Sequence, residues 1–162
     1  MKPSKADKQE KTNVMRLLDA AGISYTPHFY DPTLTDGQSV ADTVGKPQDE
    51  TFKTLVTRGA SGGYHVFVIP VNCTLHLKKS ARAAGEKSIA MLAQKELLPL
   101  TGYIHGGCSP IGMKKSFPTY LNDTAELFDT ICCSAGRVGA QIELSPADLA
   151  DYIGASFHDL TE

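Results

Sequence analysis

The fold is decided by the run TFKTLVTRGASGGYHVFVIPV, residues 51–71. Both of its flanks, residues 51–58 and 64–71, are rich in β-branched and aromatic residues, which favour extended strands. The five residues between them are all small and include three glycines, a composition typical of a turn. The run therefore predicts a β-hairpin, and its apolar character places that hairpin in a buried sheet.

Outward from the hairpin, helical and strand patterns alternate without strict βαβ order. Apolar residues at helical spacing predict helices over residues 12–21, 40–44, 75–84, 94–100 and 147–153. Further strands are expected over residues 23–30, 88–91, 120–121, 130–134 and 140–144. Pro27 would place its strand at a sheet edge. The fold class is therefore α/β (α+β), one domain with a mixed, mostly antiparallel sheet and packed helices.

Composition agrees with one globular domain. The chain has 162 residues, 41% hydrophobic and 21% charged, with a net charge of −2. These values exclude a disordered chain, and the absence of an overall basic field means that any nucleic acid must be held by local patches. We expect residues 1–11 to be a flexible N-terminal extension, residues 12–162 to be the domain, and the location to be cytoplasmic because no export signal is recognisable.

Cysteine and histidine usage argues against a metal or another cofactor. Four cysteines occur, none in Cys-x-x-Cys spacing, and we interpret them as reduced thiols. The five histidines are scattered, without a His-x-x-x-His pair. We therefore expect no metal ligands and no cofactor.

Two features could carry chemistry. Residues 102–112 hold four glycines and one proline, a composition that can bring main-chain N–H and C=O groups close to a ligand. The order of a phosphate-binding loop is absent, and a plain connector is the alternative. Lys53 lies inside the apolar strand of the hairpin, where it either faces solvent or supplies a fixed cation to a cleft.

The order of several short motifs resembles the YbaK/EbsC family. These motifs are residues 28–31 (HFYD), 52–55 (FKTL), 102–115 (GYIHGGCSPIGMKK) and 134–137 (SAGR). The resemblance covers roughly residues 12 to 160, and it is closest to the Cys-tRNA(Pro) deacylase branch, which is related to the editing domain of bacterial prolyl-tRNA synthetase. It implies an aminoacyl-tRNA trans-editing enzyme, needed because cysteine and proline are too close in size for one site to separate.

For the cysteine branch, the resemblance implies a substrate-assisted reaction. The thiol of the bound cysteine attacks its own ester carbonyl, which releases tRNA and a thiolactone. Cleavage of Cys-tRNA(Cys) is a further possibility within that branch. Such a protein needs no nucleophile of its own, and it must position the thiol and supply donors at the developing oxyanion.

The resemblance also implies site residues. Lys53 matches the essential lysine of the family, which we assign to anchoring the tRNA 3′ end. Gly106, Gly107 and Pro110 match the loop that holds the amino acid through main-chain groups. Further substrate contacts are expected from Phe29, Tyr30, Cys108, Ser109, Ser134 and Gln141. Gln141 stands where some relatives carry an aspartate, so it can offer only amide hydrogen bonds. Cys108 could itself be a thiol nucleophile, but we favour a small side chain turned away from substrate.

The expected partners are mischarged tRNA(Pro) and prolyl-tRNA synthetase in a ternary complex, with neither DNA nor membrane. A candidate tRNA track consists of Lys78, Lys79, Arg82, Lys114 and Lys115. A solvated helix face explains the first three nearly as well. Two alternatives remain open: an Ala-tRNA(Pro) deacylase of the same fold, and a non-catalytic module that binds tRNA or a synthetase.

Overall fold

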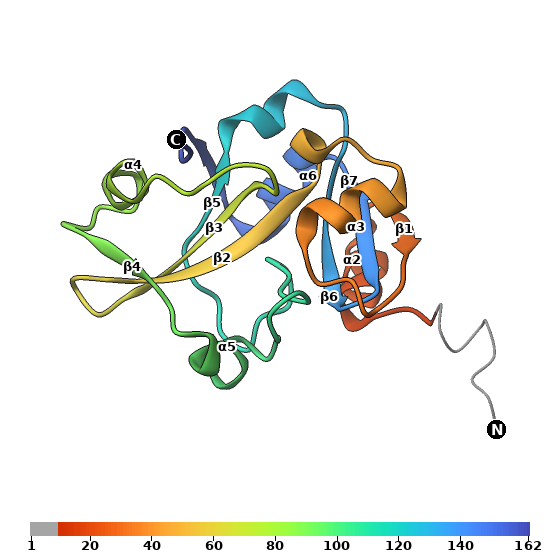
Figure 1. Ribbon diagram of the computed structural model, residues 1–162, viewed down its shortest axis with the longest axis horizontal. Coiled ribbons are helices and arrows are strands. Elements are labelled where there is room, and N and C mark those ends of the chain that lie inside the picture. Colours follow the sequence, from red (N-terminus) through yellow and green to blue (C-terminus); the bar gives the residue numbers. More distant parts are fainter. Residues whose placement is uncertain (1–9) are drawn as a thin grey trace.

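The hairpin is the centre of the larger of two sheets. A computed structural model describes residues 10–162, so most of the expected N-terminal extension lies outside the described residues (Figure 1). Strands β2 (Phe52–Gly59) and β3 (Tyr64–Pro70) pair antiparallel over their whole length, as predicted. The sheet order is β4-β2-β3-β5-β8, and the strands that flank the hairpin are β4 (Ile89–Met91), β5 (Thr119–Asn122) and β8 (Ser156–His158), of which β4 and β8 are the edges. We call this the hairpin sheet.

The second sheet, which we call the small sheet, has the order β1-β7-β6. Its antiparallel strands are β1 (Thr26–Phe29), β6 (Ile131–Arg137) and β7 (Ala140–Leu144). Pro27 lies on β1, which is an edge strand as expected. A parallel bridge between Thr51 and Cys132 joins the small sheet to the beginning of β2. The two sheets therefore meet at the start of the hairpin.

The predicted fold class is confirmed: among the described residues, only β3–β5 and β5–β8 pair parallel, and helices pack beside both sheets (Figure 1). The α-helices are α2 (Asn13–Ala21), α3 (Gly37–Val44), α4 (Leu77–Ala83), α5 (Gln94–Thr101) and α6 (Pro146–Ile153). Two short 3₁₀ segments, η1 (Gln48–Glu50) and η2 (Asp123–Leu127), were not predicted. No helix in the described part of the chain is both long and apolar enough to cross a bilayer.

Helix ends follow the local sequence. The side chain of Thr12 accepts from the Met15 N–H and caps α2, and that of Ser145 caps α6 in the same way. Helix α3 begins earlier than expected, because Asp36 rather than Ser39 is its N-cap. The Asp36 carboxylate accepts from both the N–H and the hydroxyl of Ser39, which places Asp36 at the mouth of the cavity described below.

Two apolar clusters hold the sheets in place. The larger lies between the sheets and under α2, with Phe52, Leu121 and Ile142 among its fully buried side chains. The smaller packs Phe67 and Ile69 of the hairpin against Leu160 near the C-terminus. Because successive side chains of β2 point to opposite faces, burial of Phe52 in the larger cluster turns Lys53 the other way.

Candidate functional site

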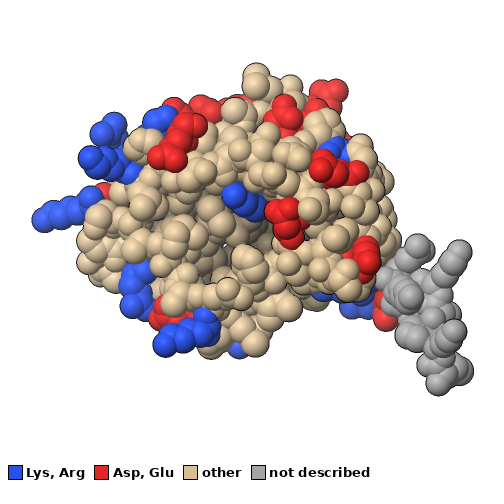
Figure 2. Space-filling view, in the orientation of Figure 1, with Lys and Arg blue, Asp and Glu red and all other residues tan. Residues whose placement is uncertain are grey.

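A cavity of about 310 Å³ lies where the hairpin sheet, the small sheet and the glycine-rich loop after α5 meet. Figure 2 shows the hollow near the centre of one face, with a basic and an acidic side chain at its edge. The walls come from several segments that are far apart in the sequence. The residues that line the cavity and matter below are Tyr30, Asp36, Lys53, Thr54, His105, Gly106, Cys108, Ser134 and Gln141.

Lys53 is the one lysine or arginine that lines this cavity in the described chain. It is the second residue of β2, lies opposite Ile69 on β3, and is partly buried. Asp36, at the start of α3, shares the cavity. Hydrogen bonds from Ser39 hold the pKa of the Asp36 carboxyl below its usual value, and the charge of Lys53 acts in the same direction. The cavity thus has a fixed cation and a fixed anion at its mouth.

The glycine-rich loop reaches the cavity through closely packed main chain. Gly106 has φ +87°, and a Cβ there would come within 3.3 Å of the Thr35 Cβ. At Gly107 a Cβ would lie 3.0 Å from the backbone nitrogen of Val138, in the turn between β6 and β7. Both positions therefore need glycine, Gly106 for its backbone angle and Gly107 for the close approach. The loop is more than a connector, because its main chain forms a wall of the cavity.

The small sheet supplies the polar side of the cavity. Ser134 on β6 and Gln141 on β7 are register partners, so their side chains emerge side by side. Tyr30 follows β1, and its N–H donates to the Gly139 carbonyl at 3.0 Å. Burial raises the pKa of the Tyr30 hydroxyl, which keeps it a protonated hydrogen-bond donor.

Two buried polar atoms in the cavity wall lack a hydrogen-bond partner within the described residues: Thr54 Oγ1 and Gln141 Oε1. Leaving such an atom unsatisfied costs about 1–3 kcal/mol. Gln141 is only 6% exposed, so bulk water does not offset that cost well. A ligand with a complementary donor would satisfy these atoms, which makes the cavity a candidate binding site.

The cysteines in and near the cavity are poor nucleophiles. Cys108 lines the wall but is 8% exposed, and burial raises the pKa of its thiol to about 12. Burial also raises the pKa of Cys132 to about 12 and that of Cys133 further. A thiol with such a pKa carries almost no thiolate at neutral pH. The raised pKa argues against Cys108 as a nucleophile, but the residue lines the cavity, whereas we expected a side chain turned away from substrate.

The structure does not bring every expected residue to the cavity. Pro110 borders a separate depression with Lys115 and Tyr152, and Ser109 is fully buried, where its hydroxyl accepts from the Ile111 N–H. Phe29 lies outside the lining and sits under the Arg137 guanidinium, 5.8 Å from ring centre to carbon. Gly107 does not line the cavity either, and it packs against the backbone of Arg137 and Val138. These residues can shape the cavity, but the lining itself comes from their neighbours.

The expected tRNA track divides into two groups. Lys78, Lys79 and Arg82 lie on α4, where Lys79 already pairs with Asp159 at 2.9 Å. Lys114 and Lys115 lie on the loop after α5, and Lys114 packs over Gly102. Figure 2 shows basic side chains gathered on the side of α4 and α5 and acidic ones on the side of α3. The α4–α5 side is therefore the more basic part of this face.

Sequence reasoning missed Thr54, Asp36 and His105 as lining residues. Thr54 could have been predicted, since it follows Lys53 directly. The alternation of side chains along the strand, however, places it on the same side as Phe52. Asp36 and His105 are exposed loop or cap residues without a periodic signal. Only the packing of α3 and the glycine-rich loop against β2 brings them to the cavity.

Comparison with known proteins decides the family. Residues 31–152 match the model of the aminoacyl-tRNA editing domain, a range that contains nearly every lining residue. The chain belongs to the aminoacyl-tRNA editing domain family. Editing domains of this family remove wrongly attached amino acids from tRNA, so the chain is an aminoacyl-tRNA deacylase, as the YbaK/EbsC resemblance implied.

Similar proteins extend over the whole chain. EbsC of Enterococcus faecalis, named as a candidate Cys-tRNA(Pro)/Cys-tRNA(Cys) deacylase, is 43% identical over 160 residues, 98% of either chain. A proline–tRNA ligase of Fervidobacterium nodosum is 29% identical over 85 residues, 52% of this chain and 15% of the ligase. The crystal structure of a candidate trans-editing enzyme for prolyl-tRNA synthetase matches with TM-score 0.81 and 23% identity over 99% of both chains, which shows the shared fold.

Proposed function

We propose that this editing domain removes cysteine from mischarged Cys-tRNA(Pro), and that the thiol of the bound cysteine is the nucleophile. One observation carries the proposal: the cavity combines a fixed cation, main-chain groups and neutral hydrogen-bonding side chains, while its own thiol, Cys108, is held protonated. Such a site can position and polarise an ester but has no activated nucleophile to attack it. The name of the E. faecalis relative supports cysteine as the amino acid and adds Cys-tRNA(Cys) as a second substrate.

The reaction balances without another reactant. The cysteine sulfur forms a bond with its own carbonyl carbon, and the ester bond to the terminal ribose breaks. The thiol proton ends on the ribose hydroxyl that leaves. The products are free tRNA and a cysteine thiolactone, which water opens later. The protein contributes by folding the cysteinyl group so that sulfur and carbon approach, an entropic contribution that can be large.

The lining residues take distinct roles in this proposal. Lys53 is the cation that anchors the 3′-terminal ribose and phosphate, close to the carbonyl oxygen. The main chain of Gly106 and Cys108 holds the amino acid, with Gly107, Ser109 and Pro110 fixing the loop from outside the lining. Tyr30 donates a hydrogen bond from its protonated hydroxyl, and Ser134 offers a second hydroxyl.

Recognition of the amino group is the proposed role of Gln141. Its Oε1 atom is buried and lacks a partner among the described residues, and a substrate ammonium group is a suitable donor to it. An amide oxygen accepts such a bond more weakly than the aspartate found in some relatives. Asp36, across the cavity, adds a negative charge that an aspartate would otherwise supply. Phe29 acts indirectly, through the contact of its ring with the guanidinium of Arg137 at the end of β6.

The tRNA itself binds through salt-sensitive contacts. We assign these contacts to Lys78 and Arg82 of α4, where Lys79 is already engaged by Asp159, and to Lys114 and Lys115 of the loop after α5. A net charge of −2 predicts weak binding of tRNA alone. We therefore propose a ternary complex with prolyl-tRNA synthetase, which already holds the tRNA in the cytoplasm. Pull-down of the synthetase only when tRNA(Pro) is present would support it, and no association at low salt would contradict it.

A substrate panel tests the proposed function. We expect rapid deacylation of Cys-tRNA(Pro) and little of Ala-tRNA(Pro) or Ser-tRNA(Pro), because alanine lacks a nucleophile and a neutral hydroxyl is a weak one. Ser-tRNA(Pro) is the matched control, since serine and cysteine differ by one atom. Equal rates on alanine would assign the alternative Ala-tRNA(Pro) specificity and overturn the cysteine proposal.

A further inference from the structure

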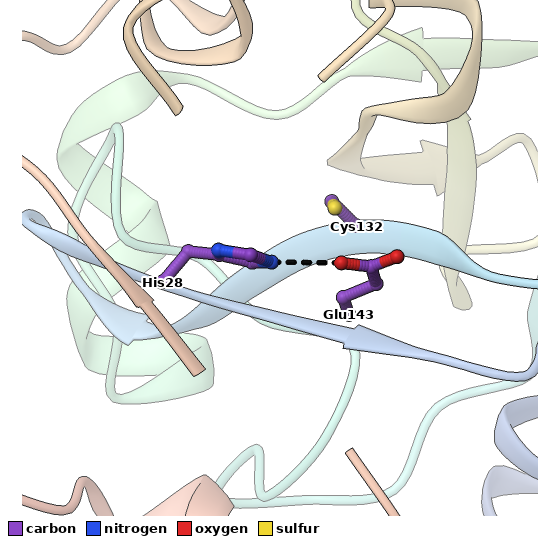
Figure 3. A group of neighbouring side chains, drawn as sticks. All are labelled: His28, Cys132 and Glu143. Carbon is purple, nitrogen blue, oxygen red and sulfur yellow. Dashed lines mark hydrogen bonds and ion pairs between the residues drawn. The ribbon is translucent and has the colours of Figure 1, made fainter. Parts of the chain in front are cut away.

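A second cluster of chemically active side chains lies on the small sheet, on the same face as Ser134 and Gln141. It consists of His28 on β1, Cys132 on β6 and Glu143 on β7 (Figure 3). One ligand atom from each lies within 4.8 Å of the other two. His28 and Glu143 point toward one another, and their Nε2 and Oε1 atoms are 2.8 Å apart. None of these three residues lines the cavity, and the proposed deacylation does not use them.

Strand register holds the cluster together. Cys132 and Glu143 are direct partners across β6 and β7, so their side chains leave the sheet side by side. His28 pairs with Gln141 across β1 and β7, one step along the same face from Glu143. The positions of all three donors are therefore set by the backbone hydrogen bonds of the three-stranded small sheet. A site built on strands is more precise than one built on loops.

We propose that His28, Cys132 and Glu143 bind one zinc ion. A set of one imidazole nitrogen, one sulfur and one carboxylate oxygen suits Zn²⁺ rather than Mg²⁺ or Ca²⁺, which favour oxygen ligands alone. Zinc bound at about 2.0–2.3 Å from each atom requires separations of roughly 3–4 Å between ligands, so only small side-chain movements are needed. Water completes a four-coordinate site. The sequence predicted no metal ligands, because three single residues from separate strands leave no spacing motif.

The surroundings of Glu143 already provide for a cation. Lys46 places its ammonium 2.9 Å from Oε1, while the Thr130 hydroxyl donates to Oε2 at 2.6 Å and orients the carboxylate. Glu50 is the other charged group that acts on both Lys46 and Cys132. The Lys46 side chain is 30% exposed, so it can move into solvent when zinc takes its place. Lys46 is therefore a built-in competitor of the metal.

Charge balance is favourable once the metal is bound. The Cys132 thiol releases its proton to solvent, and the thiolate and the Glu143 carboxylate together neutralise the two charges of Zn²⁺. Because Cys132 is 1% exposed, an unneutralised thiolate there would be costly, so sulfur ionises only with the metal. Removing the positive charge of Lys46 should make the site bind more tightly.

Zinc at this position would act on the cavity through the strands. Tyr30 lies two residues beyond His28, and Gln141 lies two residues before Glu143. Both line the cavity, and among the strands of the described residues β1 pairs with β7 alone, at the edge of the sheet. A bond from His28 through the metal to β6 and β7 would fix that edge. The inferred site is therefore structural, and it does not depend on which aminoacyl-tRNA is cleaved.

Cobalt, which reports thiolate ligation by its absorption, provides the test. Metal-free full-length protein is titrated with Co²⁺. We expect one ion per chain, a thiolate-to-cobalt charge-transfer band, its loss on addition of Zn²⁺, and a higher Tm with either metal. Cys73→Ser, at a cysteine outside the cluster, is the matched control and should keep the band. Absence of the band in the wild-type protein would overturn the proposal.

Variants assign the ligands. Cys132→Ser should abolish the band, whereas a band of unchanged intensity in this variant would overturn the assignment. His28→Gln, at a partly exposed residue, covers the case that Cys132→Ser does not fold, and its cobalt affinity should fall roughly tenfold or more. Lys46→Met should raise the cobalt affinity. Unchanged affinity in His28→Gln would contradict the site.

Discussion

Lys53 and Gly106 line one cavity, although they come from the first strand of the hairpin and from a loop that follows α5. Their meeting depends on two separate features of the sequence. The start of β2, residues 52–55, forms one wall of the cavity, and the positive φ of Gly106 lets the loop pass Thr35 closely. The site is thus assembled from a cation and a main-chain wall, with the small sheet opposite.

Removing the charge of Lys53 tests its role as the anchor. Lys53→Ala should lower kcat/KM for Cys-tRNA(Pro) by about 10²-fold, the size of the effect of losing a fixed charge or donor at a developing oxyanion. Its Tm should change little, because the Lys53 side chain lies at the partly exposed edge of the cavity and not in the apolar core. Lys87→Ala is the control, because it removes a lysine that does not line the cavity. A variant with wild-type kcat/KM would remove Lys53 from the mechanism.

Gly106→Ala, with its control, distinguishes the effect of an added methyl group in the cavity wall from the effect of backbone strain. The added methyl group would meet Thr35 at 3.3 Å in a backbone conformation with φ +87°, so we expect both lower stability and a loss of deacylation. Gly62→Ala is the matched control: it has φ +90° but nothing within 4 Å. The control should lose about 1 kcal/mol of unfolding free energy and keep full activity. Equal activity of the two variants would show that the loop does not hold substrate.

Thr54→Val should make the protein more stable and less active. The Thr54 hydroxyl is buried without a partner within the described chain, so replacing it by a methyl group removes a penalty of about 1 kcal/mol or more. If the hydroxyl binds substrate, KM should rise at the same time. Thr57→Val is the control, because its hydroxyl donates to the His65 carbonyl and its loss should destabilise the fold. Thermal melts and kinetics together check both effects; a less stable Thr54→Val would contradict the account.

Glu86 makes stability depend on acid pH. Hydrogen bonds from Ser61 and then His65 lower the pKa of its carboxyl to about 2, below its ordinary value of 4.5. A lowered folded-state pKa stabilises the protein above the unfolded value, and this contribution is lost as the pH falls from about 4.5 toward 2. Glu86→Gln should therefore flatten the Tm profile in that window. A profile identical to the wild type would show that Glu86 has no such role.

The sequence predicted most of the fold because its strongest signals are local. The hairpin around residues 59–63 is where expected, and helices α2 and α6 begin within one residue of the predicted positions. Strand β8 was missed, because its three residues become a strand only by pairing with β5. The start of α3 was misplaced, since Asp36 and Ser39 are both suitable caps and only tertiary contacts choose between them.

The site was predicted less completely. Lys53, Tyr30, Gly106, Cys108, Ser134 and Gln141 came from the family resemblance, and the structure places all of them at one cavity. Pro110 and Phe29 carry the same motif signal but face elsewhere, because a motif records which residues recur and not which way each side chain points. The His28, Cys132 and Glu143 cluster has no local signal, since register between three strands creates it.

Detection of the released product tests the central claim most directly. Cys-tRNA(Pro) is incubated with the protein for one turnover, and the products are trapped with an amine at once and identified by mass spectrometry. Attack by the cysteine thiol predicts the amide that forms from a cysteine thiolactone. Free cysteine as the sole initial product, with no trapped acyl group, would mean that water attacks the ester and would contradict the account.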